Sequence, residues 1–318
     1  MTKKWYQMKE QAAGEKRLMF LWYVYRIFGK RIVQFFTIFV AFFAFVLSKD
    51  VRKYAKINLS VIYEYCKKKS LKTTKPDIFN RFKTVLNYAL SLVDKMETFC
   101  GDFDVKRLCF ANADAADAMR KYVAQKKGMF FICSHTGLID VMRIYTIKGF
   151  ENLDREIFVN VFLSESQSQI FNNFIKNISV KSTVRTYPVE NIDMETSVEI
   201  QENLNNGELA FMAGDRLSPG SSHLSFSAEL FGQRVEFPAG TFRFAQLMGV
   251  PVFFIAAVKG KKGVYNVYMH RFEFSGTKKE TIKAMQNEYV EFVQKVSSMY
   301  PTQFYHFYPL FGEKNINI

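Results

Sequence analysis

The 318-residue chain has few of the residues that mark metal sites or disulfide scaffolds. It contains four histidines and four cysteines, the latter at Cys66, Cys100, Cys109 and Cys133. The cysteines form no C-x-x-C pair, and no histidine spacing completes a zinc site. Free thiols are typical of proteins in a reducing compartment, so we expect the body of the chain to face the cytosol.

Long apolar runs are also scarce. Only one region approaches the length of a membrane span, which excludes a polytopic transporter. Hydrophobic residues make up 48 % of the chain and charged residues 23 %, a composition that excludes a disordered chain and a fibrous repeat. The length fits one large domain or two small ones.

The excess of positive charge is confined to the first quarter of the chain. Residues 1–83 contain 19 Lys and Arg against 5 Asp and Glu, whereas residues 84–318 contain 25 of each kind. Nucleic-acid enzymes spread positive charge over a face of their core, so we expect no nucleic-acid partner. Here the basic residues flank the most apolar stretch, which indicates binding to anionic membrane lipids.

That apolar stretch is Ile32–Ser48, which carries no charge. As a helix it would be about 25 Å long, slightly short of the roughly 30 Å hydrocarbon core. An aromatic segment, Leu18–Phe28, precedes it and is interrupted by Arg26. A short spanning or re-entrant helix is the favoured interpretation, ahead of an interfacial amphipathic anchor. A cleaved signal peptide and a buried helix of a soluble protein are the remaining alternatives.

From about residue 111 onward, short apolar runs alternate with amphipathic stretches. MFFICS, EIFVNVFL, ELAFMAG and VPVFFIAAV predict strands, and FSAELFGQRVEF predicts a hairpin around Gly232. Helical stretches separate them, and a long closing helix ends before Pro301. The alternation predicts an α/β fold with a mostly parallel central sheet flanked by helices. We therefore divide the chain into a basic membrane-anchoring helical segment, 1–83, and an α/β domain, 84–318.

The segment SHTGLID follows a predicted buried strand and precedes a predicted helix, which is where open α/β sheets place their sites. His135 and Asp140 would be about 140° apart on one continuous helix, so they can meet only if the chain turns at Thr136 and Gly137 first. A carboxylate on one imidazole nitrogen would leave the other free as a base. The alternative is a loop histidine beside an unrelated acid.

A second segment, FMAGDRLSPG, ends an apolar strand with Gly214, Asp215 and Arg216. An arginine at a strand's carboxyl end can bind a phosphate or carboxylate through its guanidinium fork, and Asp215 would orient it. A purely structural Asp–Arg pair is the alternative. A third segment, FPAGTFRFAQLMGVPVFF, predicts a pocket wall or packing alone.

Together these segments resemble the glycerolipid acyltransferase superfamily. H-x4-D after a buried strand is similar to its first motif, and GDR and PAGTFRFAQLMGVPV follow in the order of its later ones. The N-terminal apolar and basic segment and the terminal YPTQFYHFYPLFG resemble the bacterial lipid A biosynthesis acyltransferase family. Phe304 and His306 depart from the Trp and Asn of that terminal run, and HTGLID departs from the aromatic residue and Glu common in lipid A enzymes.

The resemblance implies an enzyme of the cytoplasmic membrane, facing the cytosol, that moves a fatty acyl group from an acyl carrier protein or coenzyme A thioester to a lipid or glycolipid. His135 would deprotonate the acceptor's hydroxyl or amine, and Asp140 would orient the imidazole, with no acyl-enzyme, metal or cofactor. Arg216 would hold an anionic group. The predicted substrate-binding residues are Thr136, Gly137, Gly214, Asp215 and Arg216.

Two other functions compete with this one. An esterase or thioesterase would use Ser134 or Cys133 as nucleophile beside His135, but the chain has no G-x-S-x-G elbow, and neighbours on a strand point in opposite directions. A non-catalytic membrane-binding protein with a decayed site is the second alternative.

Overall fold

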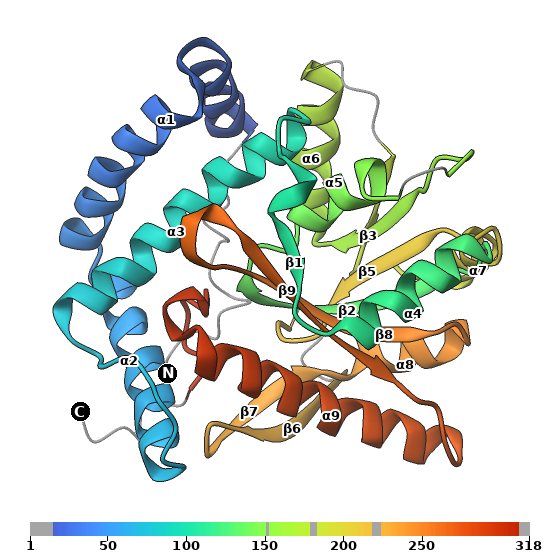
Figure 1. Cartoon of the computed structure of the whole chain (residues 1–318). Coiled ribbons are helices and arrows are strands. Elements are labelled where there is room, and N and C mark those ends of the chain that lie inside the picture. Colours follow the sequence, from blue (N-terminus) through green and yellow to red (C-terminus); the bar gives the residue numbers. More distant parts are fainter. Residues whose placement is uncertain (1–14, 151–152, 179–182, 218–223, 312–318) are drawn as a thin grey trace.

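The computed structural model describes residues 15–150, 153–178, 183–217 and 224–311. Its centre is a seven-stranded sheet with the order β1-β9-β8-β2-β5-β3-β4, and helices cover both faces (Figure 1). The five strands β8, β2, β5, β3 and β4 are parallel, while β9 runs antiparallel to β8 and pairs in parallel with β1. The predicted α/β fold with a mostly parallel sheet is confirmed.

The secondary structure follows the predicted alternation closely. The helices are α1 (Glu15–Leu47), α2 (Lys49–Lys68), α3 (Ile78–Phe99), α4 (Ala113–Ala124), α5 (Val141–Lys148), α6 (Glu165–Ile178), α7 (Met194–Asn205), α8 (Ala239–Met248) and α9 (Lys278–Met299). The strands are β1 (Leu108–Phe110), β2 (Met129–Gly137), β3 (Val159–Leu163), β4 (Val184–Pro188), β5 (Leu209–Ala213), β6 (Ser225–Leu230), β7 (Gln233–Pro238), β8 (Val252–Lys259) and β9 (Tyr265–Phe272). The predicted hairpin is β6–β7, which pairs antiparallel beside the main sheet.

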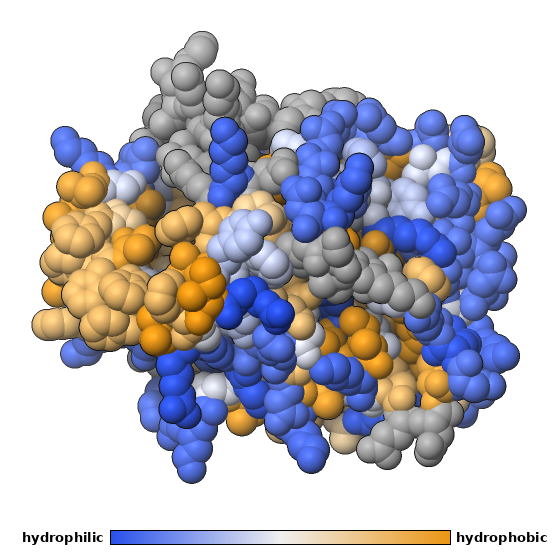
Figure 2. Space-filling model, turned by 90° about the horizontal axis from the view of Figure 1, so that it is seen from above, coloured by the Kyte–Doolittle hydropathy of each residue, from blue (hydrophilic) through white to orange (hydrophobic). Residues whose placement is uncertain are grey.

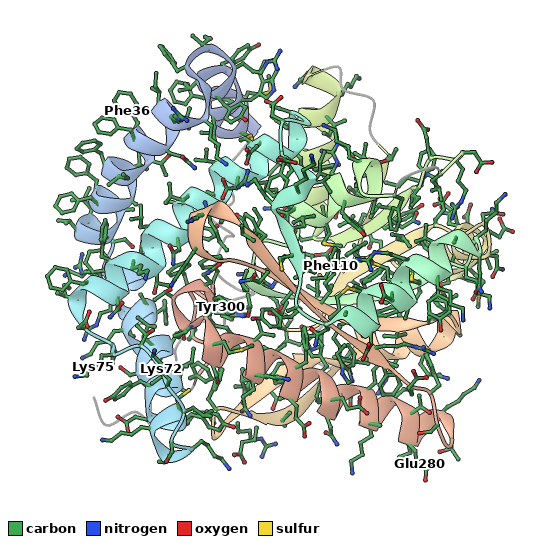
Figure 3. All side chains as sticks on the ribbon, in the orientation of Figure 1. Phe36, Lys72, Lys75, Phe110, Glu280 and Tyr300 are labelled. Carbon is green, nitrogen blue, oxygen red and sulfur yellow. The ribbon has the colours of Figure 1, made fainter. Side chains whose placement is uncertain are left out.

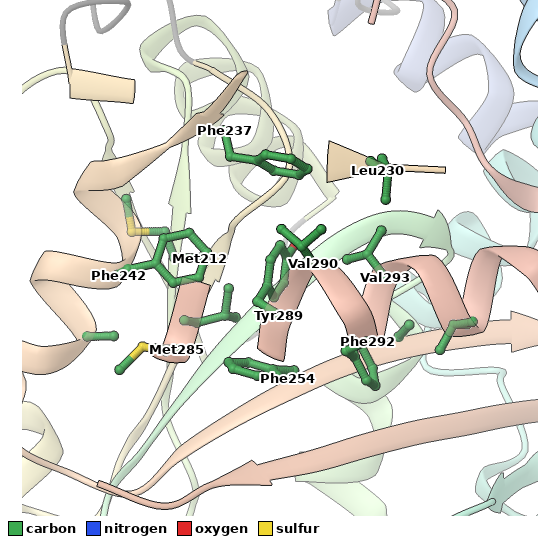
Figure 4. Packing of buried hydrophobic residues seen from close by; sticks show 14 of the residues in the cluster. Met212, Leu230, Phe237, Phe242, Phe254, Met285, Tyr289, Val290, Phe292 and Val293 are labelled. Atoms are coloured by element: carbon green, nitrogen blue, oxygen red, sulfur yellow. The ribbon is translucent and has the colours of Figure 1, made fainter. Parts of the chain in front are cut away.

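Alternating side chains of the central strands enter two separate cores, because successive side chains of a strand point to opposite faces. In β2, Phe130 and Ile132 pack on the side of α7, α8 and α9, whereas Phe131 and Cys133 pack on the side of α4 and α5. Figure 4 shows the first core around Phe254 and Tyr289. Burial on both faces explains why these strands appear in the sequence as continuous apolar runs.

Helix α1 contains a kink at Gly29, where φ is +73°, a value that glycine adopts without steric cost. The two predicted apolar segments lie on either side of this kink. Next to it, the Lys30 ammonium lies 2.9 Å from Asp94 and 2.6 Å from Glu97, both on α3. Lys259, at the end of β8, also contacts the Asp94 carboxylate, at 2.5 Å. These ion pairs tie α1 to α3 and α3 to the sheet.

Most of α1 is apolar and exposed. Its inner stripe, with Val33, Ala41 and Phe45, is buried at the side facing α3. Around this stripe lie large exposed side chains, and Figure 3 shows Phe36 pointing away from α3. Figure 2 shows a large hydrophobic patch at the left edge of the molecule, the side on which α1 lies in Figure 1. We call the large exposed apolar residues of α1 the α1 apolar face: Phe20, Tyr23, Ile27, Phe28, Ile32, Phe35, Phe36, Ile38, Phe39, Val40, Phe42, Phe43, Val46 and Leu47.

Among the described residues, Leu18–Leu47 is the one helical stretch long and apolar enough to cross a bilayer. In its most apolar 18-residue part, 17 % of the residues are buried. In the described part of the chain, this stretch is therefore not a buried core helix. The proposed boundary between residues 83 and 84 falls inside α3, which contacts both α1 and the α/β body.

Candidate active site

His135 lies at the carboxyl end of β2, the middle strand of the sheet. The ladder between β2 and β8 is regular up to Cys133 and changes register before Gly137, so His135 is in an irregular part of the strand. Such irregularities re-aim side chains, often next to active sites. On the other side of β2, the chain leaving β5 stays alongside, because the Gly214 N–H donates to the Cys133 carbonyl at 2.9 Å. This bond brings Asp215 beside the imidazole.

The Asp215 carboxylate holds His135 at two points. Nδ1 of the ring lies 2.7 Å from Oδ1, and the backbone N–H of His135 donates to Oδ2 at 2.5 Å. An ionised carboxylate only accepts, so Nδ1 carries the ring proton and Nε2 keeps a lone pair. The side chain of Asp215 is 2 % exposed and that of His135 is 34 % exposed. A buried acid therefore fixes a partly accessible base.

Two opposing effects act on the pKa of Asp215. Burial would raise it, but the neighbouring imidazoles of His135 and His306 hold the pKa of this carboxyl well below its usual range. Asp215 therefore stays ionised at neutral pH.

The second imidazole comes from the end of the chain. After α9, the short 3₁₀ helix Pro301–Gln303 turns the chain back over the site, and Phe304 forms a β-bridge with Thr136. The Tyr305 N–H then donates to the His135 carbonyl at 3.1 Å. His306, which is fully buried, places Nε2 at 3.3 Å from Asp215 Oδ2. Burial lowers the pKa of His306 to about 4, despite the adjacent carboxylate.

The structure corrects the predicted partner of His135. Asp140 is at the N-terminal end of α5, and its carboxylate lies 3.0 Å from the Lys95 ammonium on α3. Among the described residues, Asp140 and His135 share no hydrogen bond or ion pair. The predicted turn does occur at Gly137, where φ is +79°, but Asp215 takes the position at Nδ1 and the Asp140 carboxylate pairs with Lys95 instead. The prediction that Asp140 orients the imidazole is therefore wrong.

Three other predicted site residues have packing contacts. Thr136 is fully buried, with its hydroxyl 2.8 Å from that of Ser297. A Cβ at Gly137 would collide with the Ala257 carbonyl, and one at Gly214 would collide with Ile132 and Tyr289. These residues let the strands approach closely beside His135. Their predicted contact with substrate stays a prediction.

Arg216 follows directly after Asp215, and its guanidinium lies 5.0 Å from the centre of the Tyr308 ring. From the sequence we predicted that Asp215 orients this arginine. That prediction missed the contacts of Asp215 with His135 and His306. For His306, the available signal was a histidine within an otherwise apolar and aromatic terminal run. Spacing did not find either contact, because 80 residues separate His135 from Asp215.

Neither candidate nucleophile is bound to the imidazole. The Ser134 hydroxyl accepts from the Thr136 N–H at 3.3 Å, and the residue is 5 % exposed. The Cys133 thiol lies in the core on the α4–α5 side, and burial raises its pKa far above the ordinary value. A buried thiol with a raised pKa is a poor nucleophile. Both observations weigh against an acyl-enzyme formed on these residues.

Within the described parts of the chain, no group of three or more His, Cys, Asp and Glu side chains is arranged to hold a metal ion. No protein-family model matches the chain, and no curated protein matches it.

Proposed function

We propose that this protein is a membrane-associated acyltransferase that moves a fatty acyl group from a thioester to a hydroxyl or amine of a lipid or glycolipid. The observation that carries the proposal is a partly exposed imidazole held by a buried carboxylate, with neither Ser134 nor Cys133 bound to it. A base of this kind acts on a nucleophile that the substrate brings. The resemblance of the sequence to glycerolipid acyltransferases points to the same chemistry.

In the proposed reaction, Nε2 of His135 removes the proton of the acceptor hydroxyl as its oxygen attacks the thioester carbonyl carbon. The tetrahedral intermediate then collapses, the carbon–sulfur bond breaks, and the thiolate leaves. The imidazolium returns the proton to the thiolate, so the products are an ester and a free thiol. A thioester is already activated, so the step needs only proton transfer and positioning.

Asp215 takes the role that we predicted for Asp140. It is a positioning residue, because it holds Nδ1–H and so keeps the lone pair on Nε2. Its negative charge also stabilises the imidazolium that forms during attack. Arg216 remains the proposed binding group for a phosphate or carboxylate of donor or acceptor, since a guanidinium binds such groups in a bidentate manner. Coenzyme A and acyl carrier protein both stay as proposed donors.

The α1 apolar face supports a membrane location for this chemistry. A helix that is apolar around most of its circumference, with only a narrow buried stripe, favours insertion into lipid. Helix α1 packs along α3, which carries Asp94, Lys95 and Glu97, and a full crossing would draw these charges into hydrocarbon. We therefore infer that α1 lies side-on in one leaflet, with the basic residues of 1–83 at anionic head groups.

The full chain in nanodiscs, given acyl-coenzyme A or acyl-carrier protein and a panel of hydroxylated lipids, tests the proposed activity by mass spectrometry of the lipids. We expect an acylated lipid that the His135→Ala variant forms at least about 10²-fold more slowly. His270→Ala is the matched control, because His270 is a histidine on β9 paired with Glu288 and outside the site. Release of free fatty acid without acylated lipid would indicate a hydrolase, and full activity of His135→Ala would remove the imidazole from the reaction.

A further inference from the structure

His306 occupies a position that the proposed reaction does not yet use. It is fully buried, and its backbone carbonyl accepts from the Asn58 amide of α2 at 2.6 Å. Its ring is surrounded by groups of the site: Asp215 Oδ2 at 3.3 Å from Nε2, the Tyr308 hydroxyl at 2.6 Å from Nδ1, and the His135 ring at 5.8 Å between centroids. The Arg216 guanidinium, beside the Tyr308 ring, also acts on His306. A buried imidazole among polar groups requires a defined proton arrangement.

The neighbours of His306 determine where its proton lies. Burial lowers the pKa of His306 to about 4, so the ring is neutral near pH 7 and carries one proton. Nε2 faces an ionised carboxylate, which can only accept, so the proton is on Nε2. Nδ1 must then accept, and the Tyr308 hydroxyl donates to it. Burial raises the pKa of Tyr308, which keeps that phenol protonated.

We propose that His306 is a second positioning residue, which donates from Nε2 to Asp215 and holds that carboxylate in the orientation that His135 needs. The inference rests on the proposed function for its kinetic consequence, but its geometry is independent of any substrate. Oδ2 accepts the His135 backbone N–H and Oδ1 accepts the His135 Nδ1–H, whereas His306 Nε2 lies 3.3 Å from Oδ2 without an aligned hydrogen bond. Alignment of this last pair would complete a set of three donors from two segments, which would fix the carboxylate against rotation.

This arrangement makes the end of the chain part of the active site. Gln303 attaches the terminal segment to β8, because its amide donates to the Lys259 carbonyl at 2.7 Å and accepts from the Lys259 N–H at 2.8 Å. Asn58 fixes the same segment to α2. The position of His306 relative to Asp215 is therefore set by elements on both sides of the site, α2 and the sheet.

The kinetic test compares two substitutions at residue 306 in the full chain. A glutamine amide lies where Nε2 lies and keeps a donor, whereas phenylalanine keeps the ring and removes the donor. We expect His306→Phe to lower kcat at least about tenfold with KM little changed, which corresponds to the loss of one hydrogen bond to a charged group. We expect His306→Gln to stay within about threefold of the parent, because it keeps that donor. His270→Gln is the matched control. Equal kcat values for the parent and His306→Phe would overturn the inference.

A second measurement does not depend on turnover. The chain has only four histidines, so the ring protons of His135 can be assigned by NMR after histidine-selective labelling. We expect the NMR signal of the hydrogen-bonded Nδ1 proton of His135 to shift in His306→Phe, and to stay unchanged in His306→Gln and His270→Gln. If the NMR signals of the His135 ring are unchanged in His306→Phe, the positioning role is overturned, even if the enzyme proves to catalyse another reaction. If acyl transfer is absent but the His135 signals respond as stated, the proposed function fails and the inference about His306 stands.

Should His306→Phe fail to fold, Tyr308→Phe tests the same positioning role through the Nδ1 atom of His306. It removes the hydrogen bond that Nδ1 accepts, so the His306 ring is no longer held on that side and can rotate away from Asp215. We expect the His135 Nδ1 signal to shift in this variant as well. Unchanged His135 signals in Tyr308→Phe would overturn the proposed positioning of Asp215 by His306.

Discussion

At the residue scale, the site depends on which carboxylate reaches the imidazole of His135. Asp140 is close in sequence, but its carboxylate pairs with Lys95. Asp215 is distant in sequence, but the hydrogen bond from Gly214 to Cys133 brings it beside the ring. The two acids also differ in burial, since the side chain of Asp215 is 2 % exposed and that of Asp140 is 27 % exposed. The buried acid has the stronger electrostatic effect, because water screens the exposed one.

The matched substitutions Asp215→Asn and Asp140→Asn test this assignment. An asparagine at 215 can donate to Nδ1 and move the ring proton to Nε2, so we expect kcat for acyl transfer to fall at least about 10²-fold. For Asp140→Asn we expect a change within about threefold, since the Lys95–Asp140 pair is partly exposed and weak. The measurement is steady-state kinetics at several pH values. The reverse order of effects would return the orienting role to Asp140.

At the scale of the element, helix α1 has two different sides, one packed against α3 and one apolar and exposed. The stripe of Val33, Ala41 and Phe45 binds it to α3, and Lys30 adds ion pairs at the kink. Most of its outer surface is the α1 apolar face. We therefore expect a change on the outer side to weaken the proposed lipid binding without removing a contact of the inner stripe.

Replacing Phe35, Phe36 and Phe39 together by serine tests this separation. The three side chains are 49–58 % exposed, so we expect weaker binding to anionic vesicles by at least about tenfold and a nearly unchanged melting temperature. The measurement is vesicle flotation, with a high-salt wash that we expect to leave the parent protein bound. The control changes Met194 and Val198 on α7 to serine, since these are also exposed. Equal flotation of all three proteins, or release of the parent by salt alone, would contradict insertion of α1.

At the scale of the whole molecule, the site joins parts of the chain that are far apart in sequence. His135 comes from β2, Asp215 follows β5, and His306 lies beyond α9. Helix α2, from the N-terminal segment, holds the His306 carbonyl through Asn58. Folding of the whole chain is therefore required before the three side chains meet, and the stability of the molecule should depend on the protonation of this cluster.

The pH dependence of unfolding tests that link. His306 has a pKa of about 4 in the folded protein and about 6.5 when unfolded, so the unfolded state takes up a proton first as pH falls. We expect the free energy of unfolding to decline between about pH 6.5 and pH 4, by about 3 kcal/mol from this residue. Asp215, whose folded pKa is lowered, adds a further loss below its unfolded value of about 3.9.

The measurement is denaturant unfolding in one detergent at fixed ionic strength across this pH range. In His306→Gln we expect the decline between pH 6.5 and pH 4 to become shallower than in the parent by about the same 3 kcal/mol, because glutamine does not titrate. His270→Gln again serves as the control, because His270 is exposed on the surface. If the free energy of unfolding depends on pH in the same way in the parent and in His306→Gln, the pKa of His306 is not lowered in the folded protein.

Most of the fold could be predicted from the sequence, for local reasons. The turn residues Gly137, Gly149 and Gly232 lie where the chain turns or a helix ends, and continuous apolar runs form strands buried on both faces. The position of His135 at the end of a central strand also followed from the strand–helix pattern. The partner of His135 did not, because spacing along the chain carries no information on which loop from another strand comes alongside.

By itself, then, the sequence determined the alternation of strands and helices, the apolar and basic character of residues 1–83, and the presence of an imidazole at the end of β2. Each of these depends on hydrophobic period, turn residues and composition within a short window. Only the tertiary structure decided that Asp215 rather than Asp140 holds His135, and that His306 shares that carboxylate. Those contacts depend on strand order in the sheet and on the path of the chain after α9, which are set by packing among distant segments.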